Sequence, residues 1–298
     1  MTGGQSVERS RQTHAPAIAS VLTLVAMVIW TAHDVFIKLL TAGYSIPQIV
    51  FFSRILAVPL GLYLMIGKSG FLGVHPSRVG QHLFRAALSI IDMLCFASAL
   101  ALTSIANTIT INFAAPLIMT ILSVLFLRER AGWRRWLAVI VGFVGVVVVL
   151  QPSAAGFSAA SFFALGSAVA YAVFLTLTRA MTAHEPVSTM IVWNSSVVMI
   201  VMAILMMPDW QTPSSRDWVW FGLLAATGAA GQFLSTEAFR LGEASFLAPL
   251  QYTALIWATL FGYLVFADFP TPTLWLGAAI IFCATLYLVQ HEHRHGKA

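Results

Sequence analysis

The side chains most able to do chemistry in this chain are four ionisable residues inside otherwise apolar runs: Asp34, Lys38, Arg54 and Asp92. Counting about 1.5 Å per residue from the turn that joins the first two runs puts Asp34 roughly 9 Å deep and Arg54 roughly 12 Å deep, so the two could pair. Lys38 lies one helical turn from Asp34 and could screen it, while Asp92 could compete for Arg54. A buried ion pair that only joins two helices and a direct role in binding or gating both stay open.

A carboxyl group beside an arginine could also couple solute movement to protons, which is a hypothesis at this stage. Aromatic and amide side chains in the same apolar runs complete the candidate site. Flat rings stack on heteroaromatic rings, and an amide offers both a donor and an acceptor. The candidate substrate-binding or gating residues are Trp30, Asp34, Lys38, Arg54, Asp92, Asn112, Tyr171, Trp193, Asn194, Gln232, Gln251 and Tyr252.

Little in the sequence points to an enzyme, a cofactor or a metal. His33 beside Asp34 is the nearest approach to a catalytic pair, but adjacent helical residues point about 100° apart. No glycine-rich phosphate loop is present. The histidines of the 291–298 tail could bind a metal, but we expect a frayed, solvated tail. We therefore expect no catalytic residues, no cofactor and no metal.

The elements that must position these residues are membrane-spanning helices. The chain has 59% hydrophobic and only 9% charged residues, whereas a soluble domain carries about a quarter charged residues. A span needs about 20 apolar residues, and continuous apolar runs favour helices over a β-barrel. Pro116 and Pro249 are expected to interrupt the fourth and ninth spans. Ten spans are expected, at 18–40, 46–66, 83–102, 106–127, 136–150, 158–178, 187–207, 218–239, 245–266 and 273–290.

The basic residues predict how these spans are oriented. With a cytoplasmic N-terminus and ten spans, thirteen of the 16 Lys and Arg residues fall on the cytoplasmic side, which is a strong positive-inside bias. Both termini, including the 1–17 and 291–298 tails, are then cytoplasmic. The basic charge follows from this orientation, so we expect no nucleic-acid partner.

The chain also repeats itself, because the stretch 96–145 is echoed about 139 residues later by 236–284. Each repeat, 18–150 and 158–290, would hold five helices, and an odd number forces the second copy to enter the membrane from the opposite side. The loop 128–135 is rich in arginine while its counterpart 267–272 has no basic residue, as inverted repeats require. The residues that fall in register are Ala99 with Ala238, Leu102 with Leu241, Glu129 with Asp268, Trp136 with Trp275 and Gly145 with Ala284.

This order of elements, the repeat and the stretch FLRERAGWRRWLAVIVGFVGVVVVLQP at 126–152 resemble the EamA family of the drug/metabolite transporter superfamily. The resemblance covers essentially the whole chain. Three patches are similar to the branch with S-adenosylmethionine uptake and riboflavin carriers: His33-Asp34 with Lys38, the FFSR run at 51–54 and the APLQY run at 248–252. It implies a ten-helix basket with a central cavity that moves a small organic solute without nucleotide hydrolysis.

For the function we expect an inner-membrane secondary transporter that works by alternating access. The favoured solute is a flat heteroaromatic vitamin such as riboflavin, taken up from outside. The alternatives are S-adenosylmethionine uptake, or export of amino acids or drugs; a channel would differ by flux that does not saturate. The expected partners are a small-molecule solute and the lipid bilayer, and a homodimer stays open.

Overall fold

All described elements of the computed structural model are helices, which confirms the expected all-α class. The described residues are 3–59, 62, 78–126, 133–150, 158–181, 187–241 and 250–295. Taken with α5 and α6 as two halves of one span, the helices fit ten spans. They are α1 (Gly3–Leu40), α2 (Ile46–Arg54), α4 (Val79–Leu102), α5 (Ile105–Asn112), α6 (Ala115–Phe126), α7 (Trp133–Leu150), α8 (Ala159–Met181), α9 (Val187–Leu205), α10 (Asp217–Leu241), α12 (Ala254–Phe266) and α13 (Pro272–His295).

Four of these helices are long and apolar enough to cross a membrane, and five more described segments are shorter apolar helices. The long segments are Ala17–Leu40, Val79–Leu102, Ile105–Phe126 and Ala159–Thr178. The remainder of the expected second span, beyond Pro59, lies almost entirely outside the described residues.

The fourth span is interrupted, as expected. A turn at Phe113 and Ala114 separates α5 from α6, and Pro116 follows as the second residue of α6, where a residue without an N–H group is tolerated. The ninth span has a turn at the corresponding place, Tyr252 and Thr253, just before α12. Pro249 itself lies outside the described residues.

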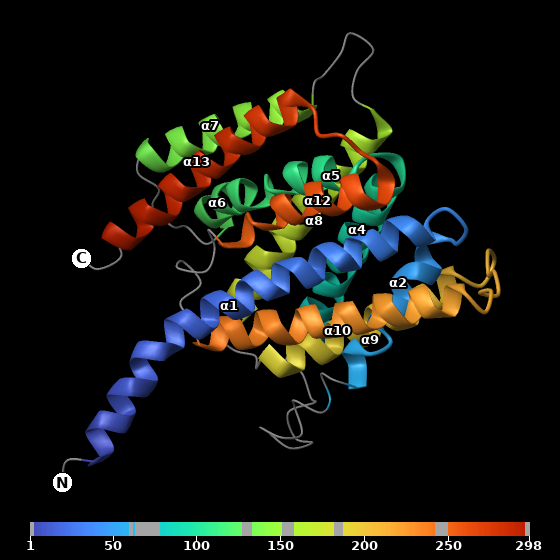
Figure 1. Cartoon of the computed structure of the whole chain (residues 1–298), viewed down its shortest axis with the longest axis horizontal. Helices are drawn as coiled ribbons and strands as arrows, with labels where there is room; N and C mark the ends of the chain where they lie inside the picture. Colours follow the sequence, from blue (N-terminus) through green and yellow to red (C-terminus); the bar gives the residue numbers. More distant parts are fainter. Residues whose placement is uncertain are drawn as a thin grey trace.

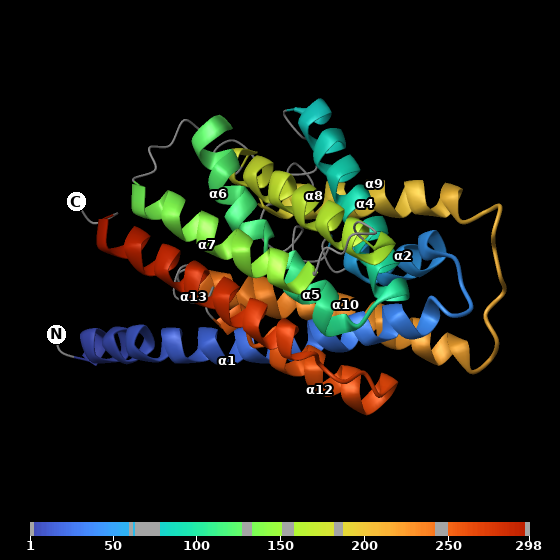
Figure 2. The same cartoon turned by 90° about the horizontal axis from the view of Figure 1, so that it is seen from above.

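Both ends of the chain are more helical than expected. The helix α1 already begins at Gly3, and α13 continues to His295 through the segment expected to fray. A helix that the apolar span has nucleated extends at little further cost, which explains the longer helices. The start of α1 and the end of α13 lie at the same end of the bundle, at the left of Figure 1 and Figure 2.

Three helix pairs pack most extensively: α1 lies along α10, α4 along α8, and α7 along α13. Figure 1 shows α7 and α13 side by side on one flank and α1 and α10 on the opposite flank, with α5, α8 and α12 between them. Close approach of α7 and α13 depends on glycine, because a Cβ atom at Gly145 would lie 2.9 Å from the carbonyl oxygen of Gly277. Fully buried large side chains join α2, α4, α5, α10 and α13, including Ile49, Leu100, Ile105, Phe221 and Leu274.

At the end of the bundle away from the termini, side chains tie neighbouring loops together, and we call this end the loop face. The Tyr44 hydroxyl donates to Asp217 Oδ2 at 2.7 Å, and Gln48 Nε2 donates to the carbonyl oxygen of Gln211 at 2.7 Å. Hydrogen bonds from Ser214 and from Tyr44 lower the pKa of Asp217 below its usual value. The turn after α1 is therefore fixed to the loop before α10.

Candidate functional site

Four helices bring polar side chains together deep inside the bundle, in what we call the central polar cluster: Arg54, Asp92, Asn112 and Ser167. Asn112 Nδ2 donates to Ser167 Oγ at 2.7 Å, and that hydroxyl donates to Asp92 Oδ1 at 2.7 Å. At about 1.5 Å per residue, all four lie roughly 10 to 15 Å from the loop-face ends of their helices. This depth is close to the middle of a hydrocarbon layer about 30 Å thick.

Arg54 is the member of this cluster with unused hydrogen-bonding capacity. Its Nη2 donates to the sulfur of Met93 at 3.2 Å, whereas its buried Nε has no hydrogen-bond partner among the described residues. Asp92 is the carboxylate that acts on Arg54 electrostatically, although within the described ranges no carboxylate oxygen lies within 4.0 Å of the guanidinium. A guanidinium carries five N–H donors, so several can still bind a solute.

Asp34, the carboxylate first expected to pair with Arg54, lies instead against His33. Its Oδ1 is 3.7 Å from His33 Nδ1, and the two side chains are only 14% and 8% exposed. The neighbouring Trp30 donates through Nε1 to Ser235 Oγ at 3.1 Å and meets the His33 ring edge-on at 5.5 Å. Gly231 makes room for the indole, because a Cβ atom there would lie 2.9 Å from the ring. Trp30 and His33 therefore pack on α10, and Asp34 does not pair with Arg54.

Lys38 does not screen Asp34, which corrects the sequence-based expectation. Its Nζ donates to Asp268 Oδ2 at 3.0 Å and to the carbonyl oxygen of Thr103 at 2.8 Å, and lies 4.7 Å from the centre of the Phe266 ring. These contacts join α1, the end of α4 and the loop after α12, and we call them the Lys38 clamp. The flexible lysine stem extends outward to the loop face, where the ammonium group pairs with the Asp268 carboxylate.

Two aromatic candidates, Tyr171 and Trp193, lie at different depths in the bundle. Tyr171 stacks on Phe174 with centroids 6.3 Å apart, keeps 37% of its surface exposed, and lies within the electrostatic field of Asp92. Trp193 lies 5.9 Å from the ring of His82, at the other end of α4. Tyr171 therefore lies near the central polar cluster, whereas Trp193 lies toward the end that holds the termini.

The amide candidates differ in how completely their hydrogen bonds are made. Asn194 is buried and donates to Ser89 Oγ at 3.3 Å, while its Oδ1 has no partner within the described part of the chain. Ser89 lies one turn before Asp92 on α4, so the Asn194 amide extends the polar surface from the cluster toward the end of the bundle that holds the termini. Gln232 and Gln251 are partly buried; Gln232 lies on α10, and Gln251 lies directly before the turn that precedes α12.

Tyr252 lies where the two interrupted spans meet. Its ring packs on Phe113 with centroids 4.6 Å apart and on Phe282 at 5.2 Å. Phe113 and Tyr252 hold corresponding positions, about 139 residues apart, at the two breaks. The breaks therefore face each other across the centre of the bundle.

Sequence reasoning missed two functional candidates. Ser167 bridges the cluster, and its position one helical turn before Tyr171 on α8 is the signal that could have revealed it. Arg85 is one of the thirteen basic residues counted on the cytoplasmic side, but it lies inside α4 and is buried. Its Nε donates to Thr178 Oγ1 at 2.7 Å and its Nη1 donates to the carbonyl oxygen of Met190 at 2.8 Å. Its spacing of seven residues from Asp92 places both on one face of α4.

The geometry suits non-covalent binding of a polar solute. In the part of the chain that the structure describes, no group of three or more His, Cys, Asp or Glu side chains could hold a metal ion. The hydroxyl, amide, carboxylate and guanidinium groups of the central polar cluster offer both donors and acceptors at one depth.

Comparisons with known proteins find similar sequences and a similar fold over most of the chain. The model of the EamA-like transporter family matches two stretches, 17–151 and 158–290. A riboflavin transporter of Vibrio cholerae is 34% identical over 233 residues, covering 76% of this chain and 78% of its own length. An S-adenosylmethionine uptake transporter of Rickettsia bellii is 28% identical over 275 residues, covering 91% and 93%. A solved structure that is 16% identical shares the fold, with a TM-score of 0.63 over 93% of this chain and 98% of that chain.

Proposed function

This chain belongs to the EamA-like transporter family and is a multi-pass membrane transporter, and from that premise we propose that it takes up a flat heteroaromatic solute, such as riboflavin, into the cell. The proposal also assigns it to the inner membrane, with both termini in the cytoplasm and the loop face outside. The family and its transporter relatives give no support to a catalytic role.

The observation that carries the choice of solute is that both deep carboxylates have a side chain nearby that can balance their charge. Asp92 accepts a hydrogen bond from Ser167 and lies in the field of Arg54. Asp34 lies 3.7 Å from His33 Nδ1, which balances its charge when the imidazole is protonated. A sulfonium cation would favour an uncompensated carboxylate, because moving a charge into a low-dielectric site requires an opposite charge. Compensated carboxylates beside a guanidinium with free donors favour a neutral solute that carries carbonyl oxygens.

A flavin ring meets these groups chemically. Its ring carbonyls and nitrogens can accept hydrogen bonds from Arg54 and Asn112, and its flat face can stack on Tyr171. The riboflavin transporter of Vibrio cholerae, at 34% identity, supports the same choice.

S-adenosylmethionine is the second candidate, because the rickettsial uptake transporter aligns over a larger share of this chain. It would require Asp34 or Asp92 to release its present partner and face the sulfonium. Removal of either carboxylate should then abolish its uptake more severely than that of a neutral flavin.

We further propose that transport proceeds by alternating access between two inverted five-helix halves. The two family matches support two copies. The packing also supports two equivalent halves. The pair α1 and α10 in one half of the bundle corresponds to the pair α8 and α4 in the other, and α7 packs on its own counterpart, α13. The facing breaks at Phe113 and Tyr252 fit binding near interrupted helices, which is common in carriers with inverted repeats.

In this scheme the Lys38 clamp is a gate. It joins α1, α4 and the loop after α12 at the proposed exterior, so opening toward the outside has to separate Lys38 from Asp268. The charge of the clamp is partly exposed, which suits a contact that must form and break in each cycle.

The decisive experiment is uptake of labelled riboflavin, S-adenosylmethionine and amino acids into proteoliposomes that contain the purified chain. We expect saturable riboflavin uptake, competition by unlabelled flavin and none by S-adenosylmethionine. Saturable uptake of S-adenosylmethionine without flavin uptake would overturn the substrate and leave the transporter class intact. Repeating the assay across an imposed pH gradient tests proton coupling.

A matched pair of variants tests the site. Arg54→Lys keeps the charge but loses the planar donor fork, so KM for riboflavin should rise by roughly 10-fold or more, as for a lost hydrogen bond to a charged group. Arg78→Lys makes the same change at an exposed position before α4 and should leave KM unchanged. An unchanged KM in the Arg54 variant would remove Arg54 from the binding site.

A further inference from the structure

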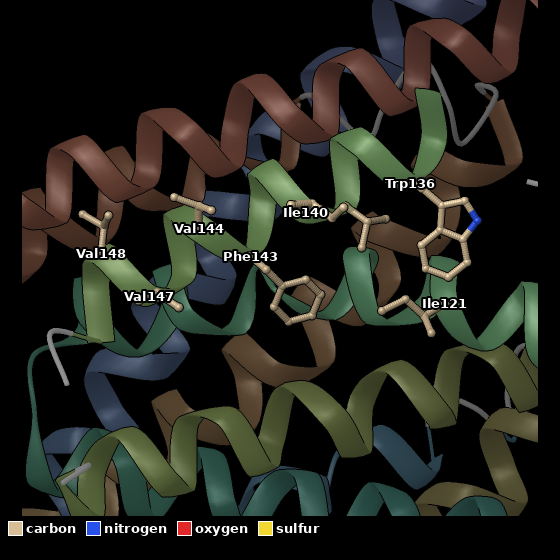
Figure 3. Close-up of a pocket in the computed structure, with 8 residues that line it drawn as sticks. Ile121, Trp136, Ile140, Phe143, Val144, Val147 and Val148 are labelled. Carbon is tan, nitrogen blue, oxygen red and sulfur yellow. The ribbon is translucent and has the colours of Figure 1, made fainter. Parts of the chain in front are cut away.

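An apolar groove runs along the outer surface of α7, between that helix and α6. It encloses about 500 Å³, and every side chain that lines it is apolar. Figure 3 shows these side chains extending along the groove from Trp136 at one end to Val148 at the other. Leu117 of α6 lies against Gly142 of α7, so the two helices touch at this point.

The dimensions of the groove match one chain of a lipid. From Trp136 to Val148 the helix rises roughly 18 Å, slightly more than half of a hydrocarbon layer about 30 Å thick. Ile140 and Val144 on its wall are 59% and 53% exposed, so the groove is open to the surface of the molecule. A lipid acyl chain fits the length, the chemistry and the membrane position.

Charge distinguishes one end of the groove from the other. Arg134 and Arg135 lie in the first turn of α7, directly before Trp136, and Arg128 and Arg130 precede them in the sequence. An indole beside basic residues is typical of the membrane interface, and clusters of Lys and Arg at this level attract anionic headgroups. The corresponding loop of the second repeat, 267–272, has no basic residue.

We propose that this groove is a binding site for an anionic phospholipid, with an acyl chain along α7 and the phosphate at the N-terminal end of α7, where the sequence has Arg134 and Arg135. The arginines of 128–135 have no basic counterpart at 267–272 in the second repeat, so the site belongs to one leaflet. The lipid stabilises α6 against α7. This assignment concerns the outer surface of the bundle and is independent of the solute carried inside.

The test is native mass spectrometry of the purified full-length chain in detergent, with added phosphatidylglycerol or phosphatidylcholine, together with the midpoint of thermal unfolding. Phosphatidylglycerol should bind and raise the midpoint, while phosphatidylcholine should do neither. With about 1 kcal/mol for each basic residue near a headgroup, the double variant Arg134→Gln/Arg135→Gln should bind phosphatidylglycerol roughly 30-fold more weakly.

Two further variants make the outcomes decisive. Arg9→Gln/Arg11→Gln removes the same charge from the first part of α1, which projects away from the bundle in Figure 1, and should bind the lipid like the natural sequence. Val144→Trp fills the groove and should abolish the response. Equal weakening by both arginine pairs, equal binding of both lipids, or a dimer that Val144→Trp dissociates without any lipid effect would each overturn the proposal.

Discussion

Replacing Arg54 by alanine should destabilise the protein by uncovering the charge of Asp92. Asp92 Oδ1 already accepts from Ser167 at 2.7 Å, and Arg54 is the basic group that acts on it electrostatically. Without the guanidinium, the carboxylate keeps one hydroxyl donor and loses its counter-charge.

The size of the effect follows from the separation of the two groups. No Arg54 nitrogen lies within 4.0 Å of Asp92, and two unit charges 4 Å apart interact by about 4 kcal/mol at an effective dielectric constant of about 20. At a somewhat larger distance we expect a loss of about 2 to 3 kcal/mol in the free energy of unfolding for Arg54→Ala. The double variant Arg54→Ala/Asp92→Asn removes both charges and should recover most of that loss.

The assay is a double-mutant cycle on the free energy of unfolding, measured by denaturant titration in mixed micelles. We expect a coupling energy of about 2 kcal/mol between Arg54 and Asp92. Arg54→Ala/Asp34→Asn is the matched control and should show no coupling, because Asp34 lies against His33. Coupling to Asp34 with none to Asp92 would refute the assignment of Asp92 as the partner of Arg54.

Three further predictions rest on single contacts. Ser167→Ala should cost about 1 to 3 kcal/mol in the free energy of unfolding, since a buried carboxylate and an amide each lose a partner; a neutral effect in the same titration would contradict the hydrogen-bonded chain. Lys38→Gln should lower the free energy of unfolding by about 1 kcal/mol or less, because the ion pair with Asp268 is partly exposed. The double variant Lys38→Asp/Asp268→Lys, which swaps the two charges, should restore this free energy, and a failure to do so would contradict the role of the ion pair. The pKa of Asp217 is lowered by its hydrogen bonds, so its contribution to stability is present above about pH 4 and is lost as the pH falls through its folded-state pKa. Tyr44→Phe should shrink this acid-dependent loss of stability, measured as the midpoint of thermal unfolding from pH 7 to pH 3. An unchanged pH profile would exclude a stabilising role for the hydrogen bond between Tyr44 and Asp217.

Several features of the site could be predicted from the sequence because membrane burial restricts which residues are tolerated. Ionisable and amide side chains inside spans have to face the interior, so Arg54, Asp92 and Asn112 could be selected before their helices were placed. The interruption of the fourth span near Pro116 followed from the missing N–H group of proline.

The partners of these residues could not be predicted, since depth along a helix does not fix its rotation or its neighbours. Arg54 and Asp34 are at similar depth, yet Asp34 lies against its chain neighbour His33, and the carboxylate that acts on Arg54 is Asp92. Lys38 is one turn from Asp34, but its long side chain extends to the loop after α12. Arg85 was counted with the cytoplasmic basic residues because the third span was expected to begin at 83, only two residues before it, whereas α4 begins at Val79.

The sequence by itself determined the all-helical class, the membrane setting and the set of polar residues in the spans, because hydropathy and the cost of unpaired polar groups act on each segment separately. Only the tertiary structure decided which of those residues meet. Contacts such as Asn112 with Ser167, or Lys38 with Asp268, join segments far apart in the chain, and they depend on how α1, α4 and α8 rotate and pack against their neighbours.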